Sequence, residues 1–139
     1  MNTERFPLDF DSLKRGDYLP PEAVEKATLS NRRDKDYNLK VLSLASEIRK
    51  FFFYERADHV AVVIDSDGLR ILTHPEQAEY ARKMEHIGIK KILNSKGYGG
   101  AVDAAQLSDD QRESHDRWMH RNSWRIQQLR KPPPPELTN

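Results

Sequence analysis

The residues in this sequence whose types could support catalysis or metal binding are scattered. Its five histidines are His59, His74, His86, His115 and His120. No two of them lie four residues apart, the spacing that places two metal ligands on one face of a helix. Asp116 and His120 do share a helical face, but an ordinary contact between neighbouring helical turns explains that pair better than a metal site. The sequence therefore predicts no metal.

Other patterns that resemble functional motifs have simpler structural explanations. Asp65 and Asp67 are both turn-forming residues. The segment Gly97-Tyr-Gly-Gly100 lacks the ending of a phosphate-binding loop and the spacing of a dinucleotide-binding loop, so we expect it to end a helix. No serine nucleophile elbow is present, and the absence of cysteine excludes thiol nucleophiles, thiolate zinc sites and disulfides. We expect a protein that is not an enzyme, without a cofactor or an evident small-molecule substrate.

The distribution of charge along the chain is more informative than its total. The 139 residues include 23 basic and 22 acidic ones, which gives a formal net charge of +1. Residues 112–131 alone carry six bases and two acids. Within them Arg117, Arg121 and Arg125 recur every four residues, with Trp124 on the same side. Such a ladder can neutralise phosphates while the aromatic ring stacks on a base or sugar.

A structural explanation of the same arginines competes with this functional one. Arg117 could pair with Glu113 one turn earlier, and Arg112 with Asp116. Alternatively, an arginine could stack on Trp124 within the helix, or the ladder could pair with acidic residues of a partner protein. The sequence leaves both interpretations open.

Periodicity and capping patterns predict the elements that would position these residues. We expect a short extended piece in 13–19, helices at 21–29, 36–52, 75–95 and 108–131, and a hairpin formed by 59–64 and 69–73. The third and fourth helices open with the capping boxes Thr73–Glu76 and Ser108–Gln111. In the hairpin we expect Val60, Val62 and Ile64 to point to one side and Gly68 to adopt a left-handed conformation.

The second of these helices is predicted to be central to the core. Its apolar residues form one stripe at helical spacing: Tyr37, Val41, Leu44, Ala45, Ile48 and Phe52. Leu39 and Leu42 widen this arc, so we expect the helix to be covered on two sides. The aromatic run Phe51-Phe52-Phe53-Tyr54 then closes the core, and an aromatic surface for nucleic acid is the less favoured alternative.

A second basic cluster directly precedes and enters this helix. It consists of Arg32, Arg33, Lys35, Asn38 and Lys40. The order of strand, helix, polar turn, longer helix and hairpin resembles the winged helix-turn-helix class over residues 13–73. In that class the helix before the wing enters the major groove, so the resemblance implies that these five residues contact DNA. The acidic hairpin tip and the isoelectric point near 8.0 count against this assignment.

The last helix carries a narrow apolar seam that predicts a helical hairpin or a short coiled coil. His115 belongs to this seam together with a set of candidate interface residues, namely Trp118, Met119, Asn122, Ile126 and Leu129. On the preceding helix, one face is formed by Tyr80, Met84, Ile87 and Lys91, and Ala81, Gly88 and Ile92 lie beside it. The two helices should pack antiparallel as an arm, and because a narrow seam often needs a second copy to cover it, a homodimer or another protein partner is a further expectation.

These observations predict a mostly helical α+β fold. It consists of a winged-helix-like core at 1–74 with one β-hairpin, an antiparallel two-helix arm at 75–131, and an exposed proline-rich tail at 132–139. No apolar run is long enough to span a membrane, and a cytoplasmic location follows from that and from the lack of cysteine. The leading functional prediction is a non-catalytic DNA-binding or other nucleic-acid-binding module. The alternative is a protein-interaction or oligomerisation adaptor, or a small inhibitor-type protein, that acts through the arm.

Overall fold

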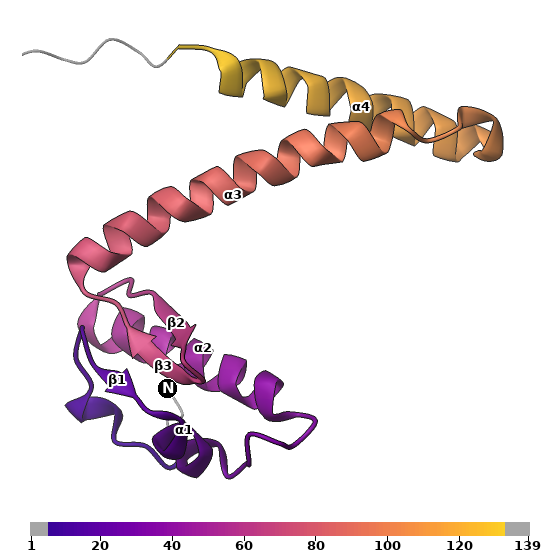
Figure 1. Cartoon of the computed structure of the whole chain (residues 1–139). Helices are drawn as coiled ribbons and strands as arrows, with labels where there is room; N and C mark the ends of the chain where they lie inside the picture. The colour runs from indigo at the N-terminus through magenta and orange to yellow at the C-terminus, as the bar shows by residue number, and fades with distance from the viewer. Residues whose placement is uncertain (1–5, 133–139) are drawn as a thin grey trace, which may run out of the picture. The chain divides into compact units, whose positions relative to one another are not determined.

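A computed structural model describes residues 6–132 of the chain (Figure 1). The described part contains four α-helices and one three-stranded antiparallel sheet, which confirms a mostly helical α+β fold. The chain divides into two compact units, residues 1–80 and residues 81–139. Apart from Pro132, the predicted tail lies outside the described residues. No helix within 6–132 is long and apolar enough to cross a membrane.

The first unit contains the sheet and two helices. Its elements are η2 (Phe10–Ser12), β1 (Tyr18–Leu19), α1 (Pro21–Thr28), α2 (Tyr37–Arg56), β2 (Val62–Asp65) and β3 (Gly68–Ile71). This is the order of strand, helices and hairpin on which the winged-helix resemblance rests. The strand order in the sheet is β1-β3-β2, so the two-residue strand β1 pairs with the outer edge of β3 (Figure 1).

The predicted hairpin is present, but its turn has a different conformation from the predicted one. Val62 lies opposite Ile71, and Ile64 lies opposite Leu69. Ser66 and Asp67 occupy the left-handed region, with φ of 47° and 65°, whereas the prediction placed Gly68 there. Two left-handed central residues are what a tight two-residue hairpin turn requires.

Gly68 is required because β1 approaches it closely. A Cβ atom at this position would lie 2.3 Å from the carbonyl oxygen of Leu19 and 2.7 Å from the hydroxyl of Tyr18. Only glycine allows this approach of one backbone to another. The glycine therefore fixes the pairing of β1 with β3 and not the turn itself.

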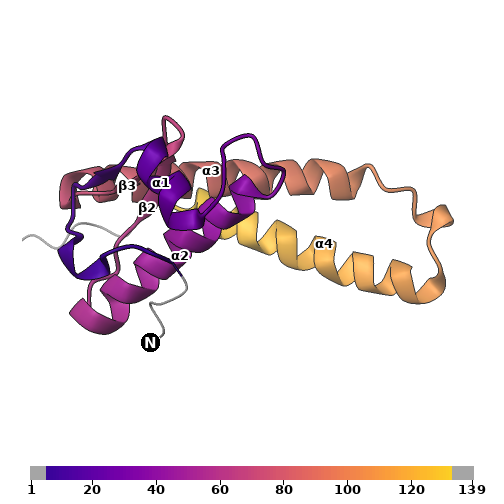
Figure 2. The same cartoon turned by 90° about the horizontal axis from the view of Figure 1, so that it is seen from below.

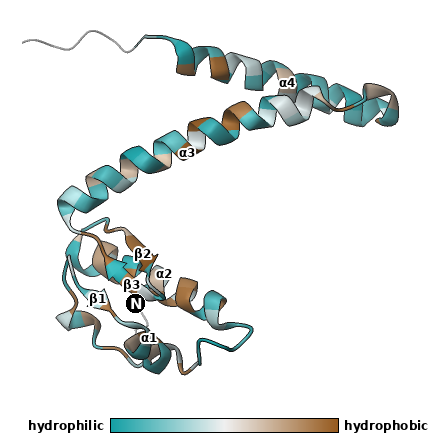
Figure 3. Ribbon diagram, viewed as in Figure 1, coloured by the Kyte–Doolittle hydropathy of each residue, from teal (hydrophilic) through white to brown (hydrophobic). Residues whose placement is uncertain are grey.

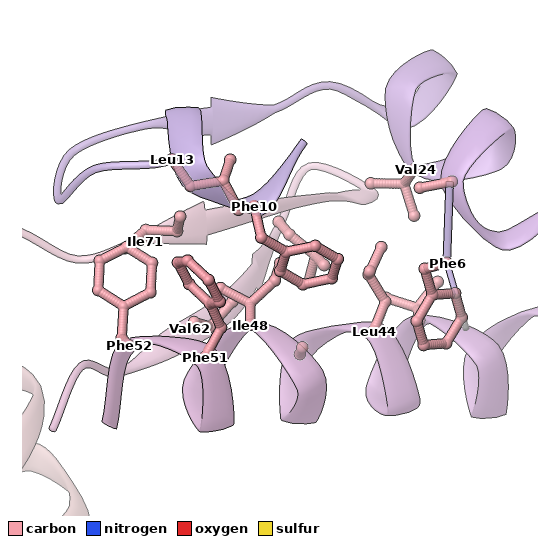
Figure 4. Close-up of a cluster of buried hydrophobic side chains, with 14 of the residues drawn as sticks. Phe6, Phe10, Leu13, Val24, Leu44, Ile48, Phe51, Phe52, Val62 and Ile71 are labelled. Carbon is pink, nitrogen blue, oxygen red and sulfur yellow. The ribbon is translucent and has the colours of Figure 1, made fainter. Parts of the chain in front are cut away.

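The core of the first unit is built on one face of α2 (Figure 4). The predicted stripe is buried, and Leu44 and Ile48 are fully excluded from solvent. They form one cluster with Val24 of α1 and with Leu69 and Ile71 of β3. Burying a side chain of this size stabilises the fold by about 1.5–3 kcal/mol. The prediction that α2 is central is confirmed.

The prediction that α2 is covered on two sides is wrong. Leu39 and Leu42 are 69% and 55% exposed, and Phe53 and Tyr54 are 52% and 69% exposed. Only Phe51 and Phe52 of the aromatic run join the core. Within the first unit, the buried residues of α2 all lie on its core-facing side, so the leucines and aromatics on the other side remain in solvent. Ile64 at the hairpin tip is likewise exposed.

The helix α2 ends one turn later than predicted. Its last residue, Arg56, lies over the ring of Phe52, with the guanidinium carbon 4.6 Å from the ring centroid. The same side chain donates hydrogen bonds to the carbonyl oxygens of Asp11, at 2.8 Å, and Leu13. These contacts hold the extra turn in place. They also attach the segment around η2 to the end of α2.

The second unit is formed by most of α3 (His74–Gly100), η3 (Ala104–Gln106) and α4 (Asp109–Arg130). Both capping boxes are observed: Glu76 bonds the backbone and hydroxyl of Thr73, and the Ser108 and Gln111 side chains each accept a backbone amide. The third helix does end in the predicted glycine segment, but at its last residue, Gly100, and so five residues later than the predicted Ser95. Residues 101–108 make the connection.

Gly99 lies in the helix because α4 packs directly on it. A Cβ atom at Gly99 would lie 2.5 Å from the indole of Trp118 and 2.7 Å from the sulfur of Met119. One turn away, the amide nitrogen of Asn122 donates to the hydroxyl of Ser95 at 3.1 Å. The residue numbers rise on α4 as they fall on α3, which confirms the antiparallel arm (Figures 1 and 2).

The covered face of α3 lies beside the predicted apolar face. In the second half of the helix the more covered positions are Gly88, Ile89, Ile92, Ser95 and Gly99, of which Gly88 and Ile92 were predicted to flank that face. Tyr80, Met84 and Ile87, which define the predicted apolar face, are exposed. Small residues at Ser95 and Gly99 let α4 approach more closely than bulky side chains would allow, so the contact forms there.

Candidate nucleic-acid interface

The basic cluster before α2 is partly neutralised within the first unit. The Nε atom of Arg32 lies 2.8 Å from Glu25, and a second nitrogen of Arg32 lies 3.8 Å from Glu22. The Nζ atom of Lys40 lies 3.3 Å from Asp36. Two of the four cations in the predicted contact set therefore already have carboxylate partners.

The other members of this set are exposed but lie among acidic residues. The side chains of Arg33, Lys35 and Asn38 face solvent and have no ion-pair partner among residues 6–132. Asp34 and Asp36 alternate with them along the chain. The first unit as a whole contains 12 bases and 15 acids, a net charge of −3. Its field therefore opposes the approach of a polyanion.

The arginine ladder of α4 lies in a different charge environment. The second unit contains 11 bases and 7 acids, a net charge of +4. From Arg117 to Lys131 the chain carries five bases and no acid. Figure 3 shows α4 mainly in the teal of hydrophilic residues, with a few brown segments. The boundary between the two units thus coincides with a change in the sign of the net charge.

The side chains of the ladder are exposed and without ionic partners. Arg117, Arg121 and Arg125 make no ion pair or hydrogen bond within the described chain. The two ion pairs predicted within this helix, Glu113 with Arg117 and Arg112 with Asp116, are both absent. Arg112 instead lies 3.9 Å from a carboxylate oxygen of Asp109. Trp124 is 59% exposed, and no arginine stacks on it within the described chain. Four residues of helical rise separate successive arginines by about 6 Å.

A groove of about 630 Å³ adjoins the ladder at the start of α4. It is lined by Val102, Leu107, Asp110, Gln111, Ser114, His115, Trp118 and Arg121. The rings of His115 and Trp118 are stacked, with centroids 6.0 Å apart and planes inclined by 20°. Arg121 belongs to both the groove and the ladder. The arrangement combines an aromatic surface, hydrogen-bonding groups and a free cation, and the sequence analysis missed it because residues 102–107 carry no motif.

The seam residues predicted as a partner interface are used largely within the chain. Trp118 and Met119 contact Gly99, Asn122 bonds Ser95, and Ile126 is buried. Leu129 is exposed, and Asn122 Oδ1 has no partner among the described residues. The seam therefore packs mainly on α3. Its use for a homodimer stays a prediction.

A polar cluster around Arg15 is a structural feature of the first unit. Its guanidinium donates to both carboxylate oxygens of Asp58, at 2.8 and 2.6 Å, to the carbonyl of Leu72 at 3.1 Å and to Oε1 of Gln77 at 2.9 Å. Gln77 in turn bonds the carbonyl of His59 and the amide of Ala61. The cluster joins four segments distant in sequence, so no local pattern could predict it. All its polar groups are used in bonds within the protein.

The beginning of α3 is held by a second charged contact. Arg70 Nε lies 2.8 Å from a carboxylate oxygen of Glu76. The hydrogen bond from Arg70, followed by those from the backbone and hydroxyl of Thr73, lowers the pKa of Glu76 to about 2. The hydrogen bond from Arg15 likewise lowers the pKa of Asp58.

These two carboxyl groups predict that the first unit loses stability in acid. Unfolded glutamate and aspartate titrate near pH 4, above the folded pKa values. Their stabilisation is thus present above about pH 5 and is lost as the pH falls toward about 2. Urea unfolding followed by circular dichroism at several pH values should show this loss, and Glu76→Gln should reduce its slope. An identical slope in Glu76→Gln would contradict the assignment.

Within residues 6–132, no group of three or more histidine, aspartate or glutamate side chains is placed to hold a metal ion. Comparison of the chain with models of known protein families, with characterised proteins and with solved structures gives no match.

Proposed function

We propose that the protein is a non-catalytic nucleic-acid-binding module whose contact surface is α4 and the adjoining groove. The observation that carries this proposal is the unpaired ladder of Arg117, Arg121 and Arg125 in the net positive unit. Exposed cations without internal partners release counterions from a nucleic acid without first breaking an ion pair. A cytoplasmic location belongs to the same proposal.

The aromatic groups of the second unit favour unpaired bases as the target. Trp124 is exposed beside the ladder, and the stacked pair of His115 and Trp118 lies in the groove that Arg121 shares. Bases stack on such rings only when they are not held in a duplex. We therefore expect tighter binding to single strands than to duplexes of the same length.

The predicted contact set before α2 has a smaller part in this proposal. Arg32 and Lys40 are engaged by Glu25 and Asp36, and the hairpin tip carries Asp65 and Asp67. We therefore assign at most an auxiliary role to Arg33, Lys35 and Asn38.

Fluorescence anisotropy with a labelled oligonucleotide of about 15 nucleotides tests the proposal. Affinity for the single strand should fall by about 100-fold from about 50 to about 200 mM salt if all five cations between Arg117 and Lys131 contact phosphates. Replacing Arg117, Arg121 and Arg125 by glutamine should weaken binding at low salt by at least tenfold.

Arg112→Gln is the matched control, because this arginine is on the same helix but already contacts Asp109 and donates to the carbonyl of Ala104. The affinity of Arg112→Gln for the single strand should stay within about twofold of the wild-type affinity, because a cation that contacts no phosphate contributes little to binding. Absence of binding at low salt, or equal losses in the control and the triple variant, would overturn the proposal.

A further inference from the structure

One face of α2 is apolar although it faces solvent. Leu39, Leu42, Ser46, Arg49 and Phe53 follow one another at spacings of three and four residues, which places them in a single stripe opposite the core. We call this set the outer stripe. Three of its five members are large apolar side chains that are more than half exposed, namely Leu39, Leu42 and Phe53. The solvent side of a surface helix is ordinarily polar, and exposed apolar side chains gathered on one face can mark a surface that another molecule covers.

A small pocket lies at the C-terminal end of the outer stripe. It encloses about 210 Å³ and is lined by Arg49, Lys50, Phe53, Tyr54 and His59. The centroid of the Phe53 ring lies 5.2 Å from that of Tyr54 and 6.1 Å from that of His59. The rings of Tyr54 and His59 are both nearly perpendicular to the Phe53 ring. Pockets for whole small-molecule ligands usually measure about 300–1,000 Å³. This pocket is therefore suited to a single apolar side chain of a larger partner.

The charge around the outer stripe has one sign. Arg49 is exposed and makes no ion pair or hydrogen bond within the described chain. Lys50 lies 3.6 Å from Glu47, whose own side chain is only 14% exposed. Apart from Lys40 and Glu47, the remaining polar residues of α2 between Leu39 and Tyr54 are Ser43 and Ser46. The surface thus presents apolar groups flanked by cations, in contrast to the net negative charge of the unit that carries it.

We propose that the outer stripe binds an acidic amphipathic helix of a partner protein. The outer stripe runs from Leu39 to Phe53, a helical rise of about 21 Å, which matches about four turns of a helix laid along it. Apolar residues of the partner would cover Leu39, Leu42 and Phe53, with one side chain in the pocket, and its carboxylates would face Arg49 and Lys50. A second copy of this chain fits less well, because pairing two outer stripes would bring Arg49 and Lys50 of both copies together with no well-exposed acid between them.

Selection of peptides displayed on phage against the full-length protein tests this proposal. The library contains random helical peptides of about four turns and is counter-selected against Phe53→Ser. Enriched peptides should be acidic, with apolar residues at helical spacing. A synthetic copy of one should bind with an affinity that Phe53→Ser and Arg49→Glu each lower at least tenfold. Tyr98→Ser, a change at an exposed aromatic of the second unit, should leave the affinity unchanged.

Four results would overturn the proposal. The first is no enrichment over the counter-selection, and the second is enrichment of peptides that are not acidic. The third is a dimer, seen by light scattering, that Phe53→Ser dissociates, since the occupant would then be a second copy. The fourth is an oligonucleotide affinity that depends on Phe53, since the occupant would then be a base. Because Phe53 is half-exposed, the variants should keep the circular dichroism spectrum of the wild type, and none alters the arginine ladder.

Discussion

Replacing Gly68 by alanine should destabilise the first unit by about 3 kcal/mol, the upper range for an atom forced into a packed site. The added Cβ would lie 2.3 Å from the carbonyl oxygen of Leu19 and 2.9 Å from the ring of Tyr18. Because the nearest of these atoms is backbone, a side-chain rotation cannot relieve the clash. The strand β1 must therefore separate from β3, with loss of the pairs Tyr18–Arg70 and Leu19–Leu69.

Hydrogen exchange of the β3 amides measures the expected loss of stability in the first unit, and tryptophan fluorescence follows the second unit for comparison. Both tryptophans, Trp118 and Trp124, lie in the second unit, so their unfolding transition should not move in Gly68→Ala. Gly88→Ala is the control, because a Cβ there meets nothing within 4 Å. In a helix interior that change should stabilise by about 0.5–1 kcal/mol. Unchanged exchange in β3 of Gly68→Ala would show that β1 does not pack as described.

Replacing Arg15 by alanine should cost about 3 kcal/mol, the effect of removing several charged hydrogen bonds from a largely buried site. The Arg15 side chain is 15% exposed and makes four hydrogen bonds, to Asp58, Leu72 and Gln77. Its removal leaves the carboxylate of Asp58 without its partner. It also separates the segment before β1 from the end of α2 and the start of α3.

A double-mutant cycle separates the Arg15–Asp58 contact from the rest of the cluster. Asp58→Ala in the Arg15→Ala background should cost less than in the wild type, since the shared contact is already lost. Arg15→Ala should also reduce the loss of stability in acid, because the hydrogen bond from Arg15 is the main cause of the low pKa of Asp58. Arg49→Ala, at an exposed arginine without a partner, should change the unfolding free energy by less than about 0.5 kcal/mol. Strictly additive losses for Arg15 and Asp58 would argue against the contact.

The elements of the fold were predictable from local signals. The stripe from Tyr37 to Phe52, the two capping boxes and the turn before Gly68 depend on residues within a few positions of one another, and all three predicted elements are present. Local signals could not show whether the second apolar face of α2 is covered by another element. Leu39 and Leu42 have the spacing of a buried arc, but no element of the first unit covers them.

The packing roles of two glycines were not predictable for a similar physical reason. Gly68 was predicted as the left-handed residue of the turn, and Gly99 only as part of the segment that ends a helix. In the structure each is needed because another element, β1 or α4, occupies the space that a Cβ atom would need. Contacts between segments distant in sequence also form the Arg15 cluster and the groove at Trp118. A single sequence contains no periodic signal for such contacts.

The residues of the candidate site were predicted from the sequence, but which of its cations are already paired with carboxylates was not. The sequence singled out both the residues before α2 and the ladder of α4. The ion pair of Arg32 with Glu25 joins two helical segments and could be known only from the structure, whereas Lys40 and Asp36 have the four-residue spacing of a local pair. The lack of partners for Arg117, Arg121 and Arg125 also required the structure, because the pair of Glu113 with Arg117 that the spacing allows does not form. This difference is what moves the proposed contact surface to the second unit.

The salt dependence of single-strand binding, compared between the wild type and the triple glutamine variant at Arg117, Arg121 and Arg125, tests the proposed function most directly. Each phosphate contact on a single strand contributes about 0.7 to the slope of log affinity against log salt. The account predicts that the slope of the variant is smaller by about 2, while that of Arg112→Gln is unchanged. Equal slopes in the wild type and the triple variant would contradict it.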